Sequence, residues 1–234
     1  MLAAAPMLSI VIPVLEEATT IAQALQRLAP LRDRGAEVIV VDGGSSDATV
    51  AHARPLADRV ETAPRGRAAQ MNAGAAQARG QTLLFLHADT VLPAEADRLI
   101  AAALAGGAPW GRFDVRIEGT HPMLAVVAWS MNLRSRLSGI ATGDQAMFVR
   151  RAAFDAVGGF PDIALMEDIA LSRALKRRGR PTCLRARVTT SGRRWQRHGV
   201  LRTILLMWRL RLAYFLGADP ADLAVRYGYR PAQR

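Results

Sequence analysis

The sequence predicts an α/β protein with a mostly parallel central sheet, helices on both sides of it and a C-terminal helical extension. Two observations support this fold class. Apolar, strand-like runs alternate with helix-like segments through the first two thirds of the chain, and this order favours a parallel sheet with right-handed crossovers. Half of the 234 residues are hydrophobic and 22% are charged, which is the composition of a globular domain.

The N-terminal half contains four strand-like runs, and a helical pattern follows each of them. The first run, LSIVIPV, is apolar and β-branched, as expected of a strand that is buried on both faces. In the helical pattern after it, Ile21, Leu25 and Leu28 fall on one face. The predicted strands cover residues 8–14, 36–42, 59–63 and 81–89. The predicted helices cover residues 18–29, 46–57, 67–78 and 94–105.

The pattern changes after Gly106 and Gly107. Residues 110–119 alternate in the manner of an antiparallel strand. No internal repeat or low-complexity linker interrupts the chain, so we expect one domain over residues 1–190, with a basic and apolar helical extension over residues 191–234 packed on it. Within the second half we expect helices at 122–138 and 166–178 and strands at 143–151 and 182–188.

The chain is strongly basic, with a formal net charge of +11 at pH 7. Almost all of the excess comes from arginine, since Lys176 is the only lysine, and arginine binds phosphate oxygens in a bidentate way. Nucleic acid, an anionic membrane surface and a phosphorylated substrate are therefore all candidate partners. A codon-driven composition rich in arginine and alanine explains the charge equally well.

Cysteine content and hydropathy bear on the compartment. The single cysteine, Cys183, excludes an intramolecular disulfide. Residues 1–6 carry no basic residue, so no signal peptide is predicted, and no run of about 18 uncharged apolar residues predicts a spanning helix. These features predict a cytoplasmic protein, and peripheral contact with the inner face of the cell membrane stays open.

Acidic residues follow three of the predicted strands. Glu17 lies beyond the first strand, Asp42 ends the second, and His87 and Asp89 end the fourth. In an open parallel sheet, ligands bind beyond the carboxyl ends of the strands, so we expect these side chains to converge on one edge. Taken singly, Asp42 could cap a turn and Asp89 could cap the following helix. Convergence of all of them favours a binding site.

Four sequence segments surround these positions: SIVIPVLEE at 9–17, VIVVDGGSSDAT at 38–49, RGRAAQMNAGAAQARG at 65–80 and LHADT at 86–90. Together they resemble the family-two glycosyltransferases of the bacterial, non-processive type, which have the GT-A fold. The resemblance implies a Rossmann-like sheet flanked by helices. It also implies an inverting enzyme that moves a sugar from a nucleotide-diphosphate sugar, above all a UDP-sugar, to a hydroxyl acceptor that can be lipid-linked.

The resemblance assigns donor-binding roles within these segments. Asp42 would bind the nucleotide base, and Arg67 would neutralise the pyrophosphate. Asp89 takes the second position of the family's DxD motif and His87 the first, so both are predicted to hold Mg²⁺ or Mn²⁺, since hard cations prefer oxygen ligands such as carboxylate and phosphate. His87 could instead bind a ribose hydroxyl or be a neutral histidine at a strand end. The predicted nucleotide-sugar-binding residues are Pro13, Glu17, Asp42, Gly44, Gly66, Arg67, Asn72, His87 and Asp89.

Residues 143–179 resemble the acceptor-binding region of the family, with GDQ, GGF and ED in that order. Asp168 falls at a predicted helix start, where an ionised carboxylate is favoured, and the resemblance makes it the catalytic base. Glu167 beside it is the second catalytic candidate. An ordinary acidic first turn of a helix is the alternative for this pair. Asp144 and Gln145 are predicted to contact the diphosphate or the acceptor.

Residues 191–199, SGRRWQRHG, are similar to the Q-x-x-R-W motif of processive family members. Arg194 and Trp195 match this motif and are predicted to contact the diphosphate or the acceptor. Ser191 stands in place of the glutamine, which argues against a polysaccharide synthase. A solvated basic turn is the alternative interpretation.

Residues 200–218 form an apolar and basic helical pattern. Arg202 and Arg209 share one helical face, and Arg211 lies nearly opposite. Such a helix could pack on the rest of the chain, form the contact of a homodimer or lie on a membrane surface beside a lipid acceptor.

Three other function classes fit the sequence less well than a glycosyltransferase. A nucleotidyltransferase needs a glycine-rich phosphate loop directly after the first strand, and PVLEEATT contains no glycine. A NAD-dependent dehydrogenase needs GxGxxG after a strand, and DGGSSD does not supply it. A non-enzymatic basic protein that binds membrane or nucleic acid leaves the acidic strand ends unexplained. We therefore expect a nucleotide-diphosphate sugar and a hydroxyl acceptor as partners, and no nucleic acid.

Overall fold

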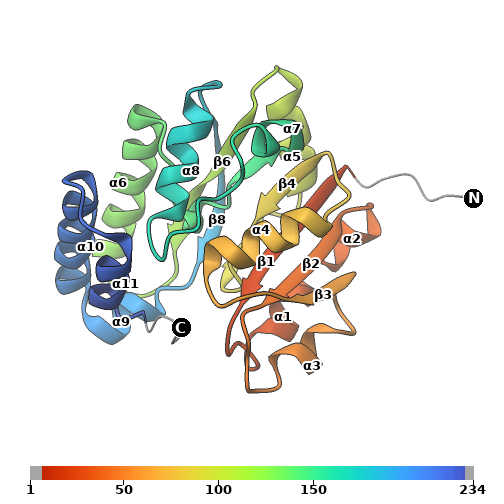
Figure 1. Cartoon of the computed structure of the whole chain (residues 1–234), viewed down its shortest axis with the longest axis horizontal. Helices are drawn as coiled ribbons and strands as arrows, with labels where there is room; N and C mark the ends of the chain where they lie inside the picture. The colour runs from red at the N-terminus through yellow and green to blue at the C-terminus, as the bar shows by residue number, and fades with distance from the viewer. Residues whose placement is uncertain (1–6, 230–234) are drawn as a thin grey trace, which may run out of the picture.

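The computed structural model describes residues 7–229 and has one eight-stranded mixed sheet between two layers of helices (Figure 1). The strand order is β3-β2-β1-β4-β7-β6-β8-β5. The predicted α/β class is confirmed. The strands are β1 Leu8–Val14, β2 Glu37–Asp42, β3 Arg59–Thr62, β4 Thr82–Phe85, β5 Thr90–Val91, β6 Trp110–Ile117, β7 Phe148–Arg150 and β8 Thr182–Thr190.

The N-terminal half of the sheet is parallel. β1 pairs in parallel with β2 on one side and β4 on the other, and β3 extends the sheet beyond β2. The register sets Val14 beside Asp42 and Val11 beside Phe85. Consequently the carboxyl ends of these strands meet at one edge, where the sequence placed its acidic residues.

The second half of the sheet is mixed. β7 is antiparallel to β4 and to β6, and the short β5 is antiparallel to the end of β8. β6 runs parallel to β8 from Gly111 to Ile117, so the expectation that 110–119 forms an antiparallel strand is only partly right. Alternation of apolar and polar residues reports which face of a strand is buried, and it carries no information about the direction of the partner.

Helices connect these strands and cover both faces. The helix predicted over 18–29 is wrong as a single element, because α1 ends before α2 begins. Pro30 lies in the first turn of α2, where its missing N–H is tolerated, and it could not continue α1. The helices are α1 Ile21–Gln26, α2 Ala29–Asp33, α3 Thr49–Ala53, α4 Arg67–Gln77, α5 Ala96–Ala105, α6 Met123–Ser138, α7 Arg151–Asp155, α8 Glu167–Lys176, α9 Arg193–His198, α10 Val200–Phe215 and α11 Pro220–Tyr227, with a 3₁₀ turn, η1, at Gly143–Gln145.

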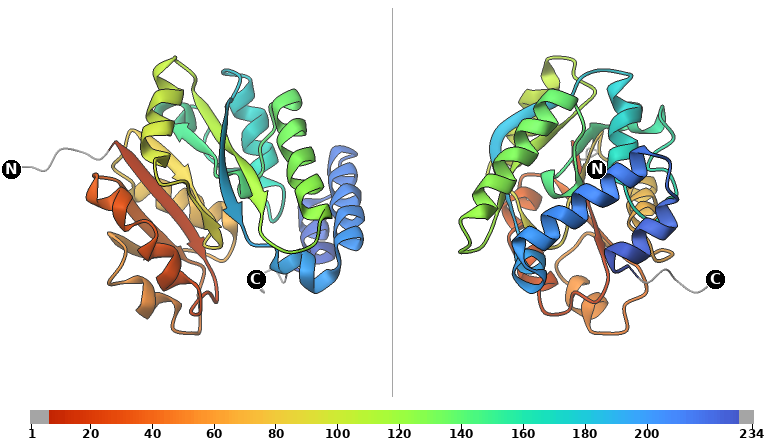
Figure 2. Two further views of the ribbon diagram at one scale, coloured as in Figure 1. Left: turned by 180° about the vertical axis from the view of Figure 1, so that it is seen from behind. Right: turned by 90° about the vertical axis from the view of Figure 1, so that its left-hand side faces the viewer.

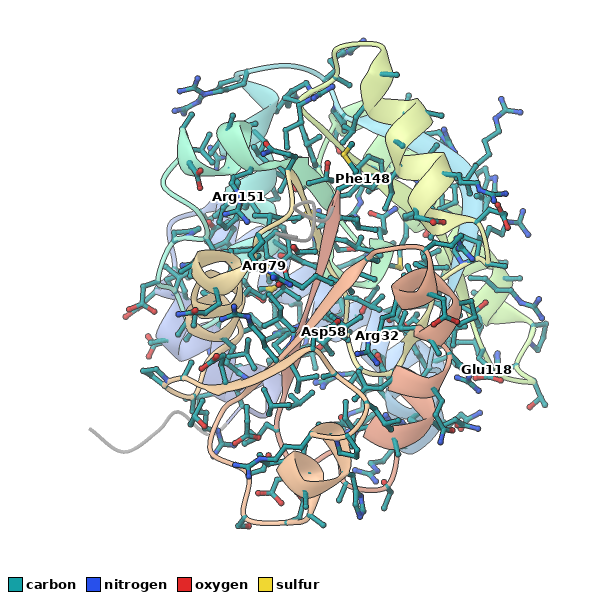
Figure 3. The ribbon with its side chains drawn as sticks, turned by 90° about the vertical axis from the view of Figure 1, so that its right-hand side faces the viewer. Arg32, Asp58, Arg79, Glu118, Phe148 and Arg151 are labelled. Carbon is teal, nitrogen blue, oxygen red and sulfur yellow. The ribbon has the colours of Figure 1, made fainter. Side chains whose placement is uncertain are left out.

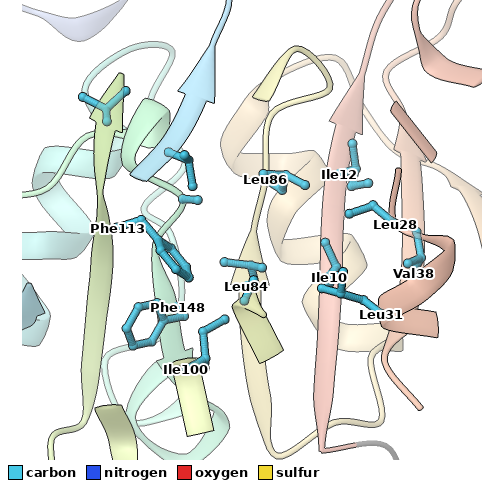
Figure 4. Close-up of a cluster of buried hydrophobic side chains, with 14 of the residues drawn as sticks. Ile10, Ile12, Leu28, Leu31, Val38, Leu84, Leu86, Ile100, Phe113 and Phe148 are labelled. Carbon is cyan, nitrogen blue, oxygen red and sulfur yellow. The ribbon is translucent and has the colours of Figure 1, made fainter. Parts of the chain in front are cut away.

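Two apolar clusters hold these helices to the sheet. Ile10 and Ile12 of β1 lie in the cluster that contains α1, α2 and α5, together with Ile100 and Phe113 (Figure 4). Val11 of the same strand lies in the other cluster, with residues of α4, α7 and α8. Because successive side chains of a strand point to opposite faces, one strand supplies both layers of the core.

Polar side chains fix the ends of the helices that reach the site (Figure 3). Arg151 donates to the main-chain oxygens of Ala75, Ala78 and Gly80, which satisfies carbonyl groups at the C-terminal end of α4. Helix α4 is therefore held at the end that faces away from the strand-end edge.

The C-terminal helices pack beside the start of α8. Leu210 and Leu223 are buried against Ile140, Met166 and Ile169. Helices α6 and α10 lie side by side at one end of the molecule (Figures 1 and 2). Within residues 7–229, no helix combines the length and the apolar character that crossing a membrane requires.

Candidate active site

A cavity of about 610 Å³ opens at the carboxyl ends of β1 and β4, and we name it the strand-end pocket. Three of the four N-terminal segments that carry the family resemblance, 9–17, 65–80 and 86–90, contribute residues to it. Residues of the C-terminal extension line it as well. Of the predicted site residues it contains Pro13, Glu17, Gly66, Arg67, His87, Asp89, Asp144, Arg194 and Trp195.

A second cavity of about 460 Å³ lies between α6 and α10, and we name it the helical pocket. Its walls are apolar side chains of the two helices, namely Met123, Val126, Val127, Met131, Leu201, Ile204, Met207 and Trp208. Its polar end contains both catalytic candidates, Glu167 and Asp168. The two pockets share Arg67, His87 and Asp144, so they meet at these side chains.

Glu167 and Asp168 begin α8 and have different partners. The residue before them, Met166, has left-handed backbone geometry with φ 71°, a conformation that is costly for a residue with a side chain. Glu167 is buried and lies 3.2 Å from Nε of Arg67. The Asp168 carboxylate instead accepts hydrogen bonds from the main-chain N–H groups of Gly143 and Ile169, at 2.8 and 2.7 Å.

Burial changes the acidity of both carboxyls. It raises the pKa of Asp168, against the opposing effect of the Gly143 amide and of Arg67. Burial also raises the pKa of Glu167, although Arg67 favours its ionised form. A carboxylate with a raised pKa is a stronger base, which is the property needed to take a proton from a hydroxyl.

His87 faces Asp144 across the meeting point of the pockets, with 3.5 Å between Nδ1 and the carboxylate. Burial disfavours the protonated imidazole, but Asp144 outweighs burial, so the pKa of His87 is raised. The backbone of Gly143 comes so close that an added Cβ would lie 2.5 Å from the imidazole ring. Glycine at 143 is therefore a requirement of the close approach between η1 and His87.

Arg67 is the first residue of α4, whose N-terminus opens into the strand-end pocket. Gly66 before it has φ 148°, a value that glycine adopts at no steric cost. Burial disfavours the charged guanidinium, but Glu167, together with Tyr229, Tyr227 and Asp168, outweighs burial, so the pKa of Arg67 is raised. The ring of Tyr229 lies 5.5 Å from this guanidinium. A helix N-terminus and an arginine together suit an anion.

Asp89 and Glu17 lie at the mouth of the strand-end pocket. Nη2 of Arg193 lies 3.9 Å from a carboxylate oxygen of each. Among residues 7–229, no three His, Cys, Asp or Glu side chains gather into a metal site. Asp89 is about one third exposed, with side-chain exposure of 33%, so it can accept a cation whose remaining ligands are phosphate oxygens and water, the mode that Mg²⁺ favours.

Four predicted site residues do not line either pocket. Asp42 accepts hydrogen bonds from the main chain of Gly44 and Ser45, so its carboxylate orders its own loop. Asn72 both donates to and accepts from the main chain of Phe160, which ties α4 to the GGF segment. Gln145 is buried and accepts from the main-chain N–H of Thr142. The residues outside the pockets are thus Asp42, Gly44, Asn72 and Gln145.

Several pocket residues carried no sequence signal. Gln70 lines the strand-end pocket and donates to the main-chain oxygens of Val14 and Val41, and only its place on the inner face of α4 could have indicated it. Tyr227 contacts Arg194, whose guanidinium lies 3.6 Å from the ring centre and donates to the tyrosine carbonyl. This contact joins positions far apart in the sequence and could not be predicted from spacing.

Comparison with solved structures supports the fold. Staphylococcus aureus TarS in complex with UDP-GlcNAc has a TM-score of 0.64 and 20% identity, covering 79% of this chain and 58% of that one. A mannosyltransferase from Pyrobaculum calidifontis, in complex with GDP-Man and Mn²⁺, has a TM-score of 0.64 and 21% identity, covering 97% of this chain and 70% of that one. Glucosyl-3-phosphoglycerate synthase from Mycobacterium tuberculosis, in complex with Mn²⁺, UDP and phosphoglyceric acid, has a TM-score of 0.63 and 18% identity, covering 98% of this chain and 81% of that one.

The chain spans 60% of the length of a TarS fragment of residues 1–349. No curated protein sequence matches the chain. A family model described as glycosyl transferase family 2 matches residues 9–158, which is more than half of the chain and includes the N-terminal segments that line the strand-end pocket. The expected GT-A fold is confirmed by the structural matches. The chain belongs to glycosyltransferase family 2.

Proposed function

We propose that the chain is an inverting glycosyltransferase that moves a sugar from a nucleotide-diphosphate sugar, with UDP as the preferred nucleotide, to a hydroxyl acceptor. The observation that carries this proposal is that the two pockets meet at Arg67, His87 and Asp144, with Glu167 and Asp168 at the adjoining end of the helical pocket. One pocket offers cationic groups for a diphosphate, and the other presents a basic carboxylate beside an apolar cavity.

The donor occupies the strand-end pocket in this proposal. Arg67 and the N-terminus of α4 bind the diphosphate, because both offer N–H donors and positive charge. Arg194 lines the same pocket and adds a second guanidinium. The nucleotide base of the donor lies toward the loop that Asp42 orders. Asp42 therefore binds the nucleotide base through that loop, or directly after the loop moves.

Asp89, with His87 as the second predicted side chain, would hold Mg²⁺ or Mn²⁺. When bound, the cation would neutralise the diphosphate and so stabilise the leaving group. The Mn²⁺ in the Pyrobaculum and Mycobacterium enzymes supports a divalent cation in this chain. The partly exposed carboxylate of Asp89, which lines the strand-end pocket, supports it independently.

The acceptor enters through the helical pocket, and its apolar walls favour a lipid-linked molecule. Asp168 takes the proton of the acceptor hydroxyl as the oxygen attacks the anomeric carbon of the sugar. The bond from that carbon to the diphosphate breaks on the opposite side, and the nucleoside diphosphate leaves. Glu167 holds Arg67 in place beside the leaving group. A single displacement of this kind inverts the anomeric configuration.

Exposed apolar side chains on α6 and α10 support peripheral contact with a membrane surface. Trp129 and Trp208 are the largest of them, and both are more than half exposed. Tryptophan and arginine together suit the boundary between lipid and water. We therefore place the chain on the inner face of the cell membrane, and we place the catalytic domain at residues 1–190 with the extension completing the pockets.

The test of the proposed function is donor binding followed by transfer. The thermal midpoint of the full chain is measured with a panel of UDP- and GDP-sugars, with and without Mn²⁺, since a ligand of the folded state raises its stability. We expect one nucleotide sugar to raise the midpoint in a Mn²⁺-dependent way and Asp89→Ala to abolish that shift while keeping the unliganded midpoint. Failure of every nucleotide sugar to bind would refute the proposal.

A further inference from the structure

Two arginines in the helical pocket have no partner within the part of the chain that the structure describes. Arg134 of α6 and Arg211 of α10 both line the cavity. Neither side chain forms an ion pair or a hydrogen bond with any residue between 7 and 229, and Nε and Nη2 of Arg134 are buried without an acceptor. Burial lowers the pKa of Arg211, which reports the same lack of a compensating charge.

An uncompensated guanidinium in an apolar cavity is costly. The carboxylates at the polar end of the pocket do not pair with either arginine: Glu167 pairs with Arg67, Asp144 with His87, and Asp168 accepts main-chain N–H groups. The helices themselves offer no acid, since no Asp or Glu occurs between Glu118 and Asp144 or between Asp168 and Asp219. An anion supplied from outside the chain would satisfy both arginines.

We infer that the helical pocket binds a phospholipid acceptor whose headgroup carries a free hydroxyl. Arg134 and Arg211 bind the phosphate, the apolar walls of α6 and α10 contact the first part of the chains, and the hydroxyl lies at Asp168. The inference rests on the proposed function and names its acceptor. The reaction forms a bond from the hydroxyl oxygen to the anomeric carbon, breaks the bond to the diphosphate and transfers the hydroxyl proton to Asp168.

The mouth of the pocket fits delivery from a bilayer. Both helices that form the pocket walls also carry exposed apolar side chains, and the two helices lie side by side (Figures 1 and 2). Arg202 and Arg209 are exposed on α10 and complement anionic lipid. The exposed apolar residues are Val126, Trp129, Leu133 and Leu137 of α6 and Leu201, Leu205, Trp208, Leu212 and Phe215 of α10.

The experiment measures binding of a monomeric short-chain lipid to the full chain by calorimetry. Dihexanoyl phosphatidylglycerol is the probe, because it has acyl chains, an anionic phosphate and free hydroxyls. Glycerol 3-phosphate lacks the chains, and dihexanoyl phosphatidylcholine carries a compensating cation and no hydroxyl. We expect each of these two to bind at least about tenfold more weakly than the probe. Equal affinity for either one would overturn the inference.

Arg134→Met and Arg211→Met test the two arginines. Arg209→Met is the matched control, because Arg209 lies on α10 with Arg211 but outside the pocket. We expect each pocket variant to bind the probe about tenfold more weakly and the control to bind it like the wild type. Because the pocket charges are uncompensated, both pocket variants should keep or raise the thermal midpoint. Unchanged binding, or unfolding of both pocket variants, would overturn the inference.

Binding is measured without donor and without turnover, so its outcome is independent of the proposed reaction. Lipid binding that fails while a nucleotide sugar still binds would leave the transferase proposal standing and remove only the acceptor. If the lipid binds but no nucleotide sugar does, the lipid site would stand and the transferase proposal would fall.

Discussion

At the scale of single residues, the two carboxylates that begin α8 are adjacent in sequence and separate in role. The side chain of Glu167 is paired with a guanidinium, whereas Asp168 accepts only main-chain N–H groups and keeps its charge available. Sequence resemblance picked out both residues. It named Asp168 as the base, but it could not predict their different partners, because these come from α4 and η1, which the spacing of the ED motif does not report.

Asp168→Asn keeps the size of the side chain and removes the basic oxygen. We expect turnover to fall by about 10²–10⁴-fold, because general-base catalysis is lost, with little change in nucleotide-sugar affinity. Glu167→Gln is the matched comparison and should lower turnover less. The measurement is turnover with a competent acceptor beside calorimetric donor affinity. Near wild-type turnover in Asp168→Asn, with loss in Glu167→Gln, would move the base to Glu167.

The raised pKa of Asp168 predicts the direction of a pH effect. The base must be ionised, so activity is lost as the pH falls through the pKa of Asp168 in the folded enzyme. Since burial raises that pKa above the ordinary aspartate value of 3.8, the acidic limb of kcat/KM should lie above that value. A profile that stays flat down to the ordinary aspartate range would contradict the assignment.

Glu37 offers a residue-scale test of stability away from the site. Its buried carboxylate accepts hydrogen bonds from Ser9 and from both the main chain and the side chain of Arg79. Burial opposes ionisation, but these donors outweigh it and lower the pKa of Glu37. The stabilisation is therefore complete above the unfolded value near 4.5 and is lost as the pH falls through the folded pKa.

We expect Glu37→Gln to cost roughly 2 kcal/mol of unfolding free energy at pH 7, because hydrogen bonds to a charged group are lost. The difference from wild type should shrink below the unfolded pKa. Glu118→Gln is the control, since that exposed carboxylate has no side-chain partner among the described residues (Figure 3 labels Glu118 and Arg79). Urea unfolding at several pH values checks this, and a difference independent of pH would count against it.

At the scale of elements, the strands that end in the site were predictable and the turn that faces them was not. Apolar, β-branched runs located β1 and β2 to within one residue. The segment 143–151 was expected to be one strand, but it divides into η1 and β7. The division follows from Gly143, whose main chain must approach His87 and donate to Asp168, and such a contact between distant segments has no local pattern.

Gly143→Ala tests the contact between η1 and His87. The added Cβ would lie 2.5 Å from Cε1 and 2.6 Å from Nε2 of the imidazole, so the ring or the turn must move. We expect a fall in turnover of about tenfold or more, since a displacement near 1 Å disturbs both pockets. Gly106→Ala, where an added Cβ meets open space, is the control. Equal turnover in both variants would show that the close approach is not needed.

At the scale of the whole molecule, the C-terminal extension completes the site instead of standing apart from it. α10 forms one wall of the helical pocket, and Tyr227 lines both pockets. Sequence predicted that the extension would be helical and basic. Its contact with α6 and its unpartnered Arg211 depend on packing between segments far apart in the chain, so no periodicity could indicate them.

The same placement predicts how the molecule meets a membrane. Leu205 and Leu212 are 55% and 60% exposed on α10 and do not line the helical pocket, so they can be changed without altering that pocket. Inserting each into the lipid boundary contributes roughly 1 kcal/mol, less than the 1.5–3 kcal/mol of full burial. We expect Leu205→Ser with Leu212→Ser to reduce binding to phosphatidylglycerol vesicles by more than about tenfold in a flotation assay. Val225→Ser on α11, at a site 59% exposed, should bind like the wild type.

Binding of the wild type should also weaken as salt rises, because exposed arginines attract the anionic surface through screened charges. The double variant should keep its affinity for the monomeric short-chain lipid, since the pocket is unchanged. This pair of results separates docking on the bilayer from recognition of one lipid molecule. If the double variant and the wild type float equally, the exposed side chains of α10 do not enter the membrane, and a contact between two copies of the chain becomes the remaining use for that face.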